Sequence, residues 1–242
     1  MSRFLTILLL LCTGFCLFAQ NEDVNVESAS AENLSTLSSQ AFLNVIRKPL
    51  RIDAWGEFTG SIVNKGAKGK HSGNLRVRIT FTKDAMFTQI VLNEVNVYSL
   101  EQKHSGENAN ASVKLDLPAK ETEPGLFDFG VRPEDMSFSF IYWDFVEELP
   151  REKKRMSECR VFRLASPDKD GTVLVWFHAS HGFPLEARWY KSDAKEHWRK
   201  LELKGAKRHA NGLWFVKEMR MEGKDWKTQV SFDHVELNAP GE

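Results

Sequence analysis

Hydrophobic and polar residues follow three different patterns along this chain of 242 residues. The segment from Phe4 to Gln20 carries no charge, residues 34–46 place apolar side chains at helical spacing, and from residue 50 onward apolar and polar residues mostly alternate. Alternation with a period of two is typical of strands that bury one face. The pattern therefore predicts an apolar leader, one short helix and a domain made mostly of strands.

The helical segment has an apolar stripe that stops before Pro49. Proline ends a helix because it has no backbone N–H to donate. The members of the stripe are Leu34, Leu37, Ala41, Phe42, Val45 and Ile46. We expect this amphipathic helix to pack its apolar face against the sheet.

Strand patterns are clearest toward the C-terminus, where six alternating segments are separated by turn residues, which favours an antiparallel meander. The six segments are Cys159–Leu164, Thr172–His178, Leu185–Tyr190, Trp198–Leu203, Leu213–Met221 and Lys227–Leu237. Earlier strands are predicted at 76–82, 87–92, 95–98 and Ser112–Leu117, with loops at 64–74 and 104–110. A sheet of this length must curl, and alternation gives it one apolar side.

Residues 136–145, which follow a segment bounded by prolines, fit two patterns. The helical set is Met136, Phe140 and Trp143, and the strand set is Phe138, Phe140 and Tyr142. Both interpretations stay open. If the segment is helical, Phe138, Phe140 and Trp143 would form a lid over the apolar side of the sheet. The charged run 151–155 after it is interpreted as a solvated loop.

Residues 1–20 have the layout of a secretory signal peptide. Arg3 precedes the apolar run, and small Ala19 offers cleavage near Ala19 or Gln20. The run of about 15 residues is shorter than the roughly 20 that a permanent transmembrane helix needs. We expect an exported, periplasmic chain with no transmembrane helix in its mature form. The alternatives are a retained anchor or a lipid attached at Cys16.

Cleavage would leave the charge balanced and remove most of the cysteines. Of 33 basic and 33 acidic residues only Arg3 is lost, so no basic excess for nucleic acid arises. Cys159 is then the one cysteine left, so no disulfide framework is expected and the core must supply the stability. We divide the chain into a signal peptide (1–20), a disordered lead-in without aromatic residues (21–33) and one domain (34–238).

Motifs for covalent or metal chemistry are missing from the sequence: no Gly-x-Ser-x-Gly, phosphate-binding glycine-rich loop or His-Glu-x-x-His occurs. His178 and His181 suggest no third ligand, so we interpret them as a surface turn. Glu147 and Glu148 are chain neighbours that normally point apart, and Cys159 is expected to be a packed thiol. We expect no enzyme activity, no cofactor and no metal site.

Four segments carry a more specific pattern than alternation. They are Glu134-Asp-Met-Ser-Phe-Ser-Phe-Ile-Tyr-Trp143, Val175-Trp-Phe-His178, Gly182-Phe-Pro-Leu-Glu-Ala-Arg-Trp-Tyr190 and Gly212-Leu-Trp-Phe-Val-Lys-Glu-Met219. In this order they resemble the LolA-like family of outer-membrane lipoprotein-sorting proteins. The resemblance is good over residues 130–237 and looser over 50–100. It departs from the family at Phe177-His178, where the family has Ile-Asp.

The resemblance implies a mainly β (α+β) fold: a strongly curved antiparallel sheet forming an incomplete barrel, with an N-terminal helix and a helical lid over a hydrophobic cavity for acyl chains. Such chains bind by burial, at about 0.8 kcal/mol per CH₂, so the cavity needs apolar walls rather than reactive groups. From alternation we select the candidate ligand-binding residues Val175, Phe177, Leu185, Ala187, Trp189, Leu201, Leu203, Phe215 and Met219. Each of them also fits ordinary core packing.

We therefore expect a monomeric periplasmic carrier or binder of lipidated protein or lipid acyl chains. The alternative is a structural or regulatory domain of the cell envelope, in which the same curved sheet is filled by side chains and recognises a protein partner. Seven tryptophans and 17 phenylalanines suffice either to fill the interior or to line it. The volume of the cavity separates the two functions.

Overall fold

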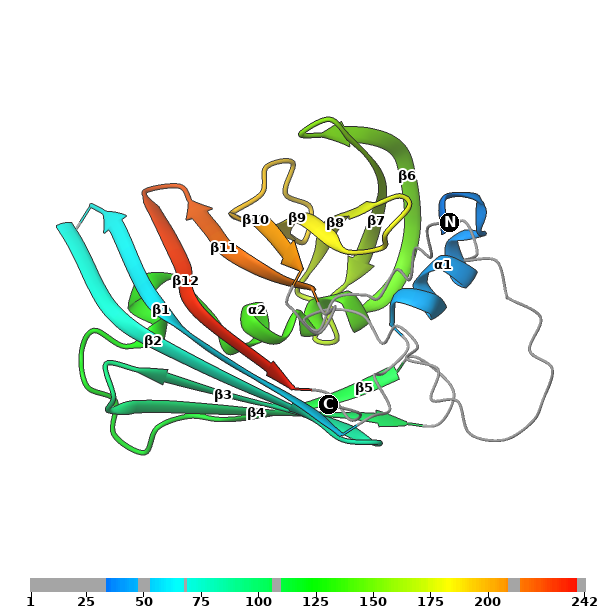
Figure 1. Cartoon of the computed structure of the whole chain (residues 1–242). Coiled ribbons are helices and arrows are strands. Elements are labelled where there is room, and N and C mark those ends of the chain that lie inside the picture. Colours follow the sequence, from blue (N-terminus) through cyan, green and yellow to red (C-terminus); the bar gives the residue numbers. More distant parts are fainter. Residues whose placement is uncertain (1–33, 48–52, 68, 106–109, 209–213, 239–242) are drawn as a thin grey trace, which may run out of the picture.

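The computed structural model describes residues 34–47, 53–67, 69–105, 110–208 and 214–238. The predicted signal peptide, the lipidation alternative at Cys16 and the lead-in at 21–33 lie outside the described residues. Within the described part, one antiparallel sheet of twelve strands curves around several short helices (Figure 1). The helices there do not combine the length and the apolar character that a membrane crossing requires.

The helices are η1 (Leu34–Thr36), α1 (Ser39–Ile46), η2 (Leu126–Phe129), α2 (Pro133–Ser137) and η3 (Ser139–Tyr142). The strands are β1 (Ala54–Gly66), β2 (Gly69–Phe81), β3 (Ala85–Leu92), β4 (Asn96–Ser105), β5 (Asn110–Asp116), β6 (Asp144–Lys154), β7 (Ser157–Ala165), β8 (Gly171–His178), β9 (Pro184–Lys191), β10 (Arg199–Arg208), β11 (Trp214–Gly223) and β12 (Trp226–Asn238).

The sheet consists of two meanders, β1 to β5 and β6 to β12, which are joined where the first strand of the chain pairs with the last. Its strand order is β5-β4-β3-β2-β1-β12-β11-β10-β9-β8-β7-β6, and β1 pairs with β12 in antiparallel register. The edge strands β5 and β6 do not pair with each other, so the barrel is incomplete. The chain between them, with η2, α2 and η3, crosses the concave side of the sheet (Figure 1). The predicted fold class is confirmed.

The core lies on the concave side, where alternation directs the apolar residues of both meanders. Phe58 and Ile62 of β1 are buried, as are Val77 and Ile79 of β2, and they belong to one cluster that includes residues of all the helices. Burial at alternate positions excludes water from one face of the sheet and leaves the other face to polar side chains. The concave side is therefore a packed interior rather than an open trough.

Two predicted loops are strands in the structure. Residues 64–74, rich in glycine and lysine, continue β1 as far as Gly66 and begin β2 at Gly69. The charged residues 151–154 lie at the end of β6, an edge strand. Charged side chains keep an edge strand from pairing with other chains, so the composition that suggested a solvated loop also suits an exposed edge.

In the ambiguous segment α2 ends at Ser137, Phe138 has a left-handed backbone with a φ of 53°, and the short helix η3 covers Ser139–Tyr142 before β6 begins at Asp144. Pro133 occupies the first turn of α2, and the carboxylate of Asp135 accepts a hydrogen bond of 2.7 Å from the backbone N–H of Arg132. Proline suits this position because the N–H that it lacks would have no partner inside the helix. The helical interpretation of the lid is therefore the one that the structure adopts.

Candidate functional site

The structure places eight of the nine predicted ligand-binding residues in or against the core of the concave side. Val175, Phe177, Ala187, Trp189, Leu201, Leu203 and Met219 are buried there, and Phe215 is partly buried against them. Their side chains therefore contact other protein groups. Their predicted contact with a ligand stays a prediction.

Leu185 lies on the opposite face of the sheet. On β9, Pro184 pairs with Phe177 and Glu186 pairs with Trp176, so Leu185 is the extra residue of a β-bulge. A bulge interrupts the alternation of faces, and Leu185 packs with Trp176 and Cys159 instead. The prediction that Leu185 lies with the concave-side residues is wrong for this reason.

Helix α1 fills the concave side next to β7 and β8. The ring of Phe42, which is completely buried, stacks on Phe162 with 5.3 Å between centroids and meets Phe177 edge-on at 5.9 Å. Gly182 permits this approach, because its φ is 72° and a Cβ there would lie 2.7 Å from Cγ2 of Ile46. The predicted packing of the helix against the sheet is thereby confirmed, and it occupies space that an acyl chain would need.

The buried side chain of Arg160, on β7, holds the segment that leads into α1 against β6 and β7. Arg160 forms an ion pair of 2.6 Å with Glu148 and donates a hydrogen bond of 2.8 Å to the carbonyl oxygen of Leu37. Glu148 also accepts a hydrogen bond from the hydroxyl of Ser39. Burial raises the pKa of Glu148, but these hydrogen bonds outweigh it and the pKa is lowered. Glu148 is therefore a structural partner of Arg160 and Ser39.

The predicted lid is packed down onto the core. Phe138 and Phe140 are 1% exposed, and Phe140 meets the ring of Trp189 edge-on with 5.2 Å between centroids. The guanidinium of Arg47, at the end of α1, donates to the carbonyl oxygens of Ile141 at 2.7 Å and Trp143 at 2.6 Å. Burial lowers the pKa of Arg47 to about 10, which leaves it charged at neutral pH. Arg47 thus holds η3 in place, and movement of the lid stays a prediction.

An open cleft of about 770 Å³, here called the lid cleft, lies between the lid, β5 and the adjoining ends of β7 to β10. This volume falls within the range of about 300–1,000 Å³ that is usual for small-molecule sites. Its aromatic lining consists of Phe140, Tyr142, Trp143, Trp189, Tyr190 and Trp198. Leu115 lines it from β5. Aromatic rings offer large apolar areas, so this part of the lid cleft suits an apolar ligand, and charged side chains such as Asp168, Asp170 and Lys191 line its other parts.

A buried ion pair lies at the wall of the lid cleft. Arg199 and Asp135 have side chains that are 3% and 2% exposed, and they form a bidentate pair with one bond of 2.9 Å. The guanidinium also lies 4.7 Å from the centre of the Trp189 ring and donates to the carbonyl oxygen of Gly130. The pair therefore fixes α2 to β10.

Glu134 is a further acidic group of the same cleft, which Asp168 and Asp170 also line. Burial raises the pKa of its carboxyl group, and Oε2 is buried without a hydrogen-bond partner among the described residues. A carboxyl group in such a position keeps its proton to higher pH than an exposed one.

The polar residues of the lid cleft were not among the predicted site residues, although one signal in the sequence pointed to them. Arg199 alternates in step with Leu201 and Leu203, so its side chain is expected on the buried face. A buried arginine needs an acidic partner. Nothing in the sequence identifies Asp135 as that partner, because 64 positions separate the two residues.

The histidine pair lies at a turn where His181 is exposed, and the single cysteine of the described residues is buried. The rings of His178 and His181 lie 4.4 Å apart, and no third His, Cys, Asp or Glu joins them as a metal ligand within the described ranges. Burial and the neighbouring His181 lower the pKa of His178. The thiol of Cys159 is buried and its pKa is raised by that burial, which makes it a poor nucleophile.

Solved structures with the same fold place this arrangement among known proteins. A domain from Vibrio parahaemolyticus that is named for outer-membrane lipoprotein sorting superposes with a TM-score of 0.61 at 14% identity, covering 78% of this chain and 87% of that one. A DUF1329 family protein from Desulfovibrio piger gives 0.61 at 13%, covering 78% and 88%. A LolA-superfamily protein from Nitrosomonas europaea gives 0.52 at 13%, covering 87% and 94%.

Sequence comparison adds nothing to this result, because no family model and no curated protein matches the chain. The likeness in structure shows that the chain has a LolA-like fold.

Proposed function

We propose that this chain binds acyl chains of a lipid or a lipidated protein on the concave side of its sheet, as a periplasmic carrier of the outer-membrane lipoprotein-sorting type. The observation that carries the proposal is an aromatic cleft of about 770 Å³ beside the lid of a LolA-like fold. The neighbour from Vibrio parahaemolyticus is named for lipoprotein sorting, which supports the same class of ligand here.

An acyl chain would enter along Leu115 and Trp143, where the lid cleft is open, and reach the rings of Phe140 and Trp189. These two rings separate the cleft from the buried core. Each buried CH₂ group contributes about 0.8 kcal/mol. A longer chain therefore gains more free energy from burial, which favours displacement of η3 from the core.

In this proposal the protein is exported and binds its ligand without turnover. Binding by burial needs no nucleophile, cofactor or metal, and it leaves the covalent structure of the ligand unchanged. Export follows from the signal-peptide layout of residues 1–20.

One observation favours a second function, that of an envelope domain with a filled core that recognises a protein. Phe177 and Leu201 are completely buried, and Trp189 is 7% exposed, so the predicted cavity is occupied by α1 and the lid. An acyl-binding protein in this state must open before it can bind a long chain. A protein-recognition domain need not open at all.

Native mass spectrometry of the gently purified exported chain tests the proposed function. We expect masses that correspond to the chain plus lipid or fatty acid, and we expect these adducts to disappear after delipidation and return when lipid is added. A chain that is always empty, and that also fails to bind a fluorescent fatty acid, contradicts the proposal and favours the filled-core alternative.

A further inference from the structure

The outer face of the sheet carries a row of lysines in direct cross-strand register. Lys70 of β2 lies opposite Lys65 of β1, and Lys65 lies opposite Lys227 of β12. The row continues through Glu222 of β11 to Lys200 of β10. We call Lys70, Lys65, Lys227 and Lys200 the lysine row. Strands lie about 4.8 Å apart, so the row extends about 20 Å across five strands.

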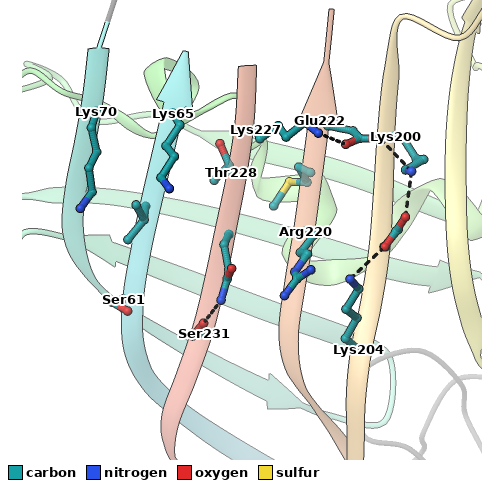
Figure 2. A pocket seen from close by; sticks show the side chains of 14 residues that line it. Ser61, Lys65, Lys70, Lys200, Lys204, Arg220, Glu222, Lys227, Thr228 and Ser231 are labelled. Carbon is teal, nitrogen blue, oxygen red and sulfur yellow. Dashed lines mark hydrogen bonds and ion pairs between the residues drawn. The ribbon is translucent and has the colours of Figure 1, made fainter. Parts of the chain in front are cut away.

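The side chains of the lysine row stand on one side of the strands and border a hollow of about 680 Å³ (Figure 2). Six basic and two acidic residues line this hollow, although the whole chain has 33 of each. The local excess of positive charge therefore does not follow from the overall composition.

The two acidic residues of the hollow are already paired. Glu202 forms ion pairs with Lys200 at 2.8 Å and Lys204 at 3.3 Å, and Glu222 forms pairs with Lys200 at 2.7 Å and Lys227 at 3.5 Å. Each carboxylate thus faces more than one cation, and the surplus charge stays on the lysines (Figure 2).

Lys65 and Lys70 have no acidic group within 4 Å in the part of the chain that the structure describes. Like charges placed directly opposite on neighbouring strands destabilise a sheet. An anionic partner would remove this repulsion, so the pair is better suited to a bound state than to the isolated chain.

The lysine row meets the lid cleft at the end of β10, where the two lie on opposite faces of the sheet. Lys200 directly follows Arg199, which lines the lid cleft, and Lys227 directly precedes the buried Thr228. Neighbouring residues of a strand point to opposite faces. The lysine row and the lid cleft therefore share the end of β10, on opposite faces of the sheet, and the other strands of the row do not border the cleft.

We propose that the lysine row docks this protein on the phosphate groups of an anionic lipid membrane. A row of about 20 Å exceeds one phosphate and fits a planar array of headgroups. Lysine ammonium groups act as mobile point charges and suit such an array, whereas arginine favours fixed bidentate contacts. This inference rests on the proposed function, because docking there would hold the protein at a membrane, which is the source of its acyl ligand.

Vesicle flotation of the exported chain tests the docking surface. The probes are vesicles of phosphatidylcholine alone and of phosphatidylcholine mixed with phosphatidylglycerol. We expect binding to the anionic vesicles only, with loss of binding as ionic strength rises and the Debye length falls from about 10 Å at 0.1 M to about 3 Å at 1 M. All variants carry the same N-terminal residues, so any vesicle binding through that segment is equal in all of them.

The triple variant Lys65→Gln, Lys70→Gln, Lys227→Gln should bind anionic vesicles about 100-fold more weakly, because each lysine near such a surface contributes about fivefold. The control triple Lys83→Gln, Lys114→Gln, Lys120→Gln changes net charge equally away from the row and should bind like the wild type. Equal loss in both triples, or no binding to anionic vesicles, overturns the inference.

A fluorescent fatty acid in solution, without vesicles, separates this inference from the proposed function. The lysine triple should retain wild-type affinity for the fatty acid. If the wild type binds the fatty acid but not the anionic vesicles, docking is wrong and the proposed function stands. Salt-sensitive binding of polyglutamate in place of vesicles would also overturn the inference and indicate an acidic protein partner.

Discussion

Arg199 shows how one polar residue organises an apolar interior. Its guanidinium holds Asp135 of α2, covers the ring of Trp189 and reaches the carbonyl oxygen of Gly130. Loss of one partner from a buried pair leaves an uncompensated charge, which typically costs about 3–5 kcal/mol. The geometry of the lid cleft therefore depends on a residue that hydrophobic alternation alone does not select.

At the same scale, Glu202 gives the outer face a defined response to acid. Burial raises the pKa of Glu202, but the hydrogen bond and charge of Lys200, with those of Lys204, outweigh it and lower the pKa from 4.5 to about 2. A carboxyl group whose pKa is lower in the folded chain stabilises the fold above pH 4.5, and this contribution is lost as the pH falls toward 2.

The variant Glu202→Gln should therefore unfold at lower urea concentration than the wild type at neutral pH, and the difference should shrink as the pH approaches 2. The matched variant Glu196→Gln, on an exposed turn, should match the wild type throughout. Urea unfolding across the pH range measures both. A deficit of Glu202→Gln that does not change with pH contradicts the assignment.

At the scale of elements, the periodic strands and the N-terminal helix could be predicted, and the departures have identifiable causes. Strand β6 carries a run of charges that resembles a loop, because an exposed edge and a loop both select charged residues. Leu185 lies on the face opposite to the predicted one, because the pairing of β8 with β9 contains a bulge. Bulges arise from pairing between strands, and one strand's own sequence does not reveal them.

The junction of the two meanders depends on Gly60. The pairing of β1 with β12 shifts its register between Thr59 and Gly60, and a Cβ at Gly60 would lie 1.9 Å from the carbonyl oxygen of Ser231. The variant Gly60→Ala should lower the free energy of unfolding by about 1–3 kcal/mol, as overpacking does. Gly66→Ala, where the nearest atom is Cβ of Trp226 at 3.3 Å, should stay within about 0.5 kcal/mol of the wild type.

Urea unfolding at neutral pH compares the two alanine variants on the same pair of strands. Equal stability of Gly60→Ala and Gly66→Ala would show that the junction tolerates a side chain at its register shift. The junction would then have to accommodate the side chain by moving β1 away from β12.

At the scale of the whole molecule, the curved open sheet was predictable and the state of its interior was not. The order of the segments resembling the LolA-like family indicated the fold, which structures at 13–14% identity share. Whether the concave side is filled depends on where Phe42 of α1 and Phe140 of η3 meet the sheet. Those contacts join distant segments, so composition and alternation leave them open.

The affinity of the variant Leu115→Glu for an uncharged fluorescent alkyl probe tests the central claim most directly. Leu115 lines the lid cleft, whereas Leu117, two residues further along, is 54% exposed and lies outside its lining. Since burying a leucine side chain contributes about 1.5–3 kcal/mol, Leu115→Glu should bind the probe about tenfold more weakly or worse. Leu117→Glu should bind like the wild type. Wild-type affinity of Leu115→Glu, or equal loss in both variants, would contradict acyl binding in the lid cleft.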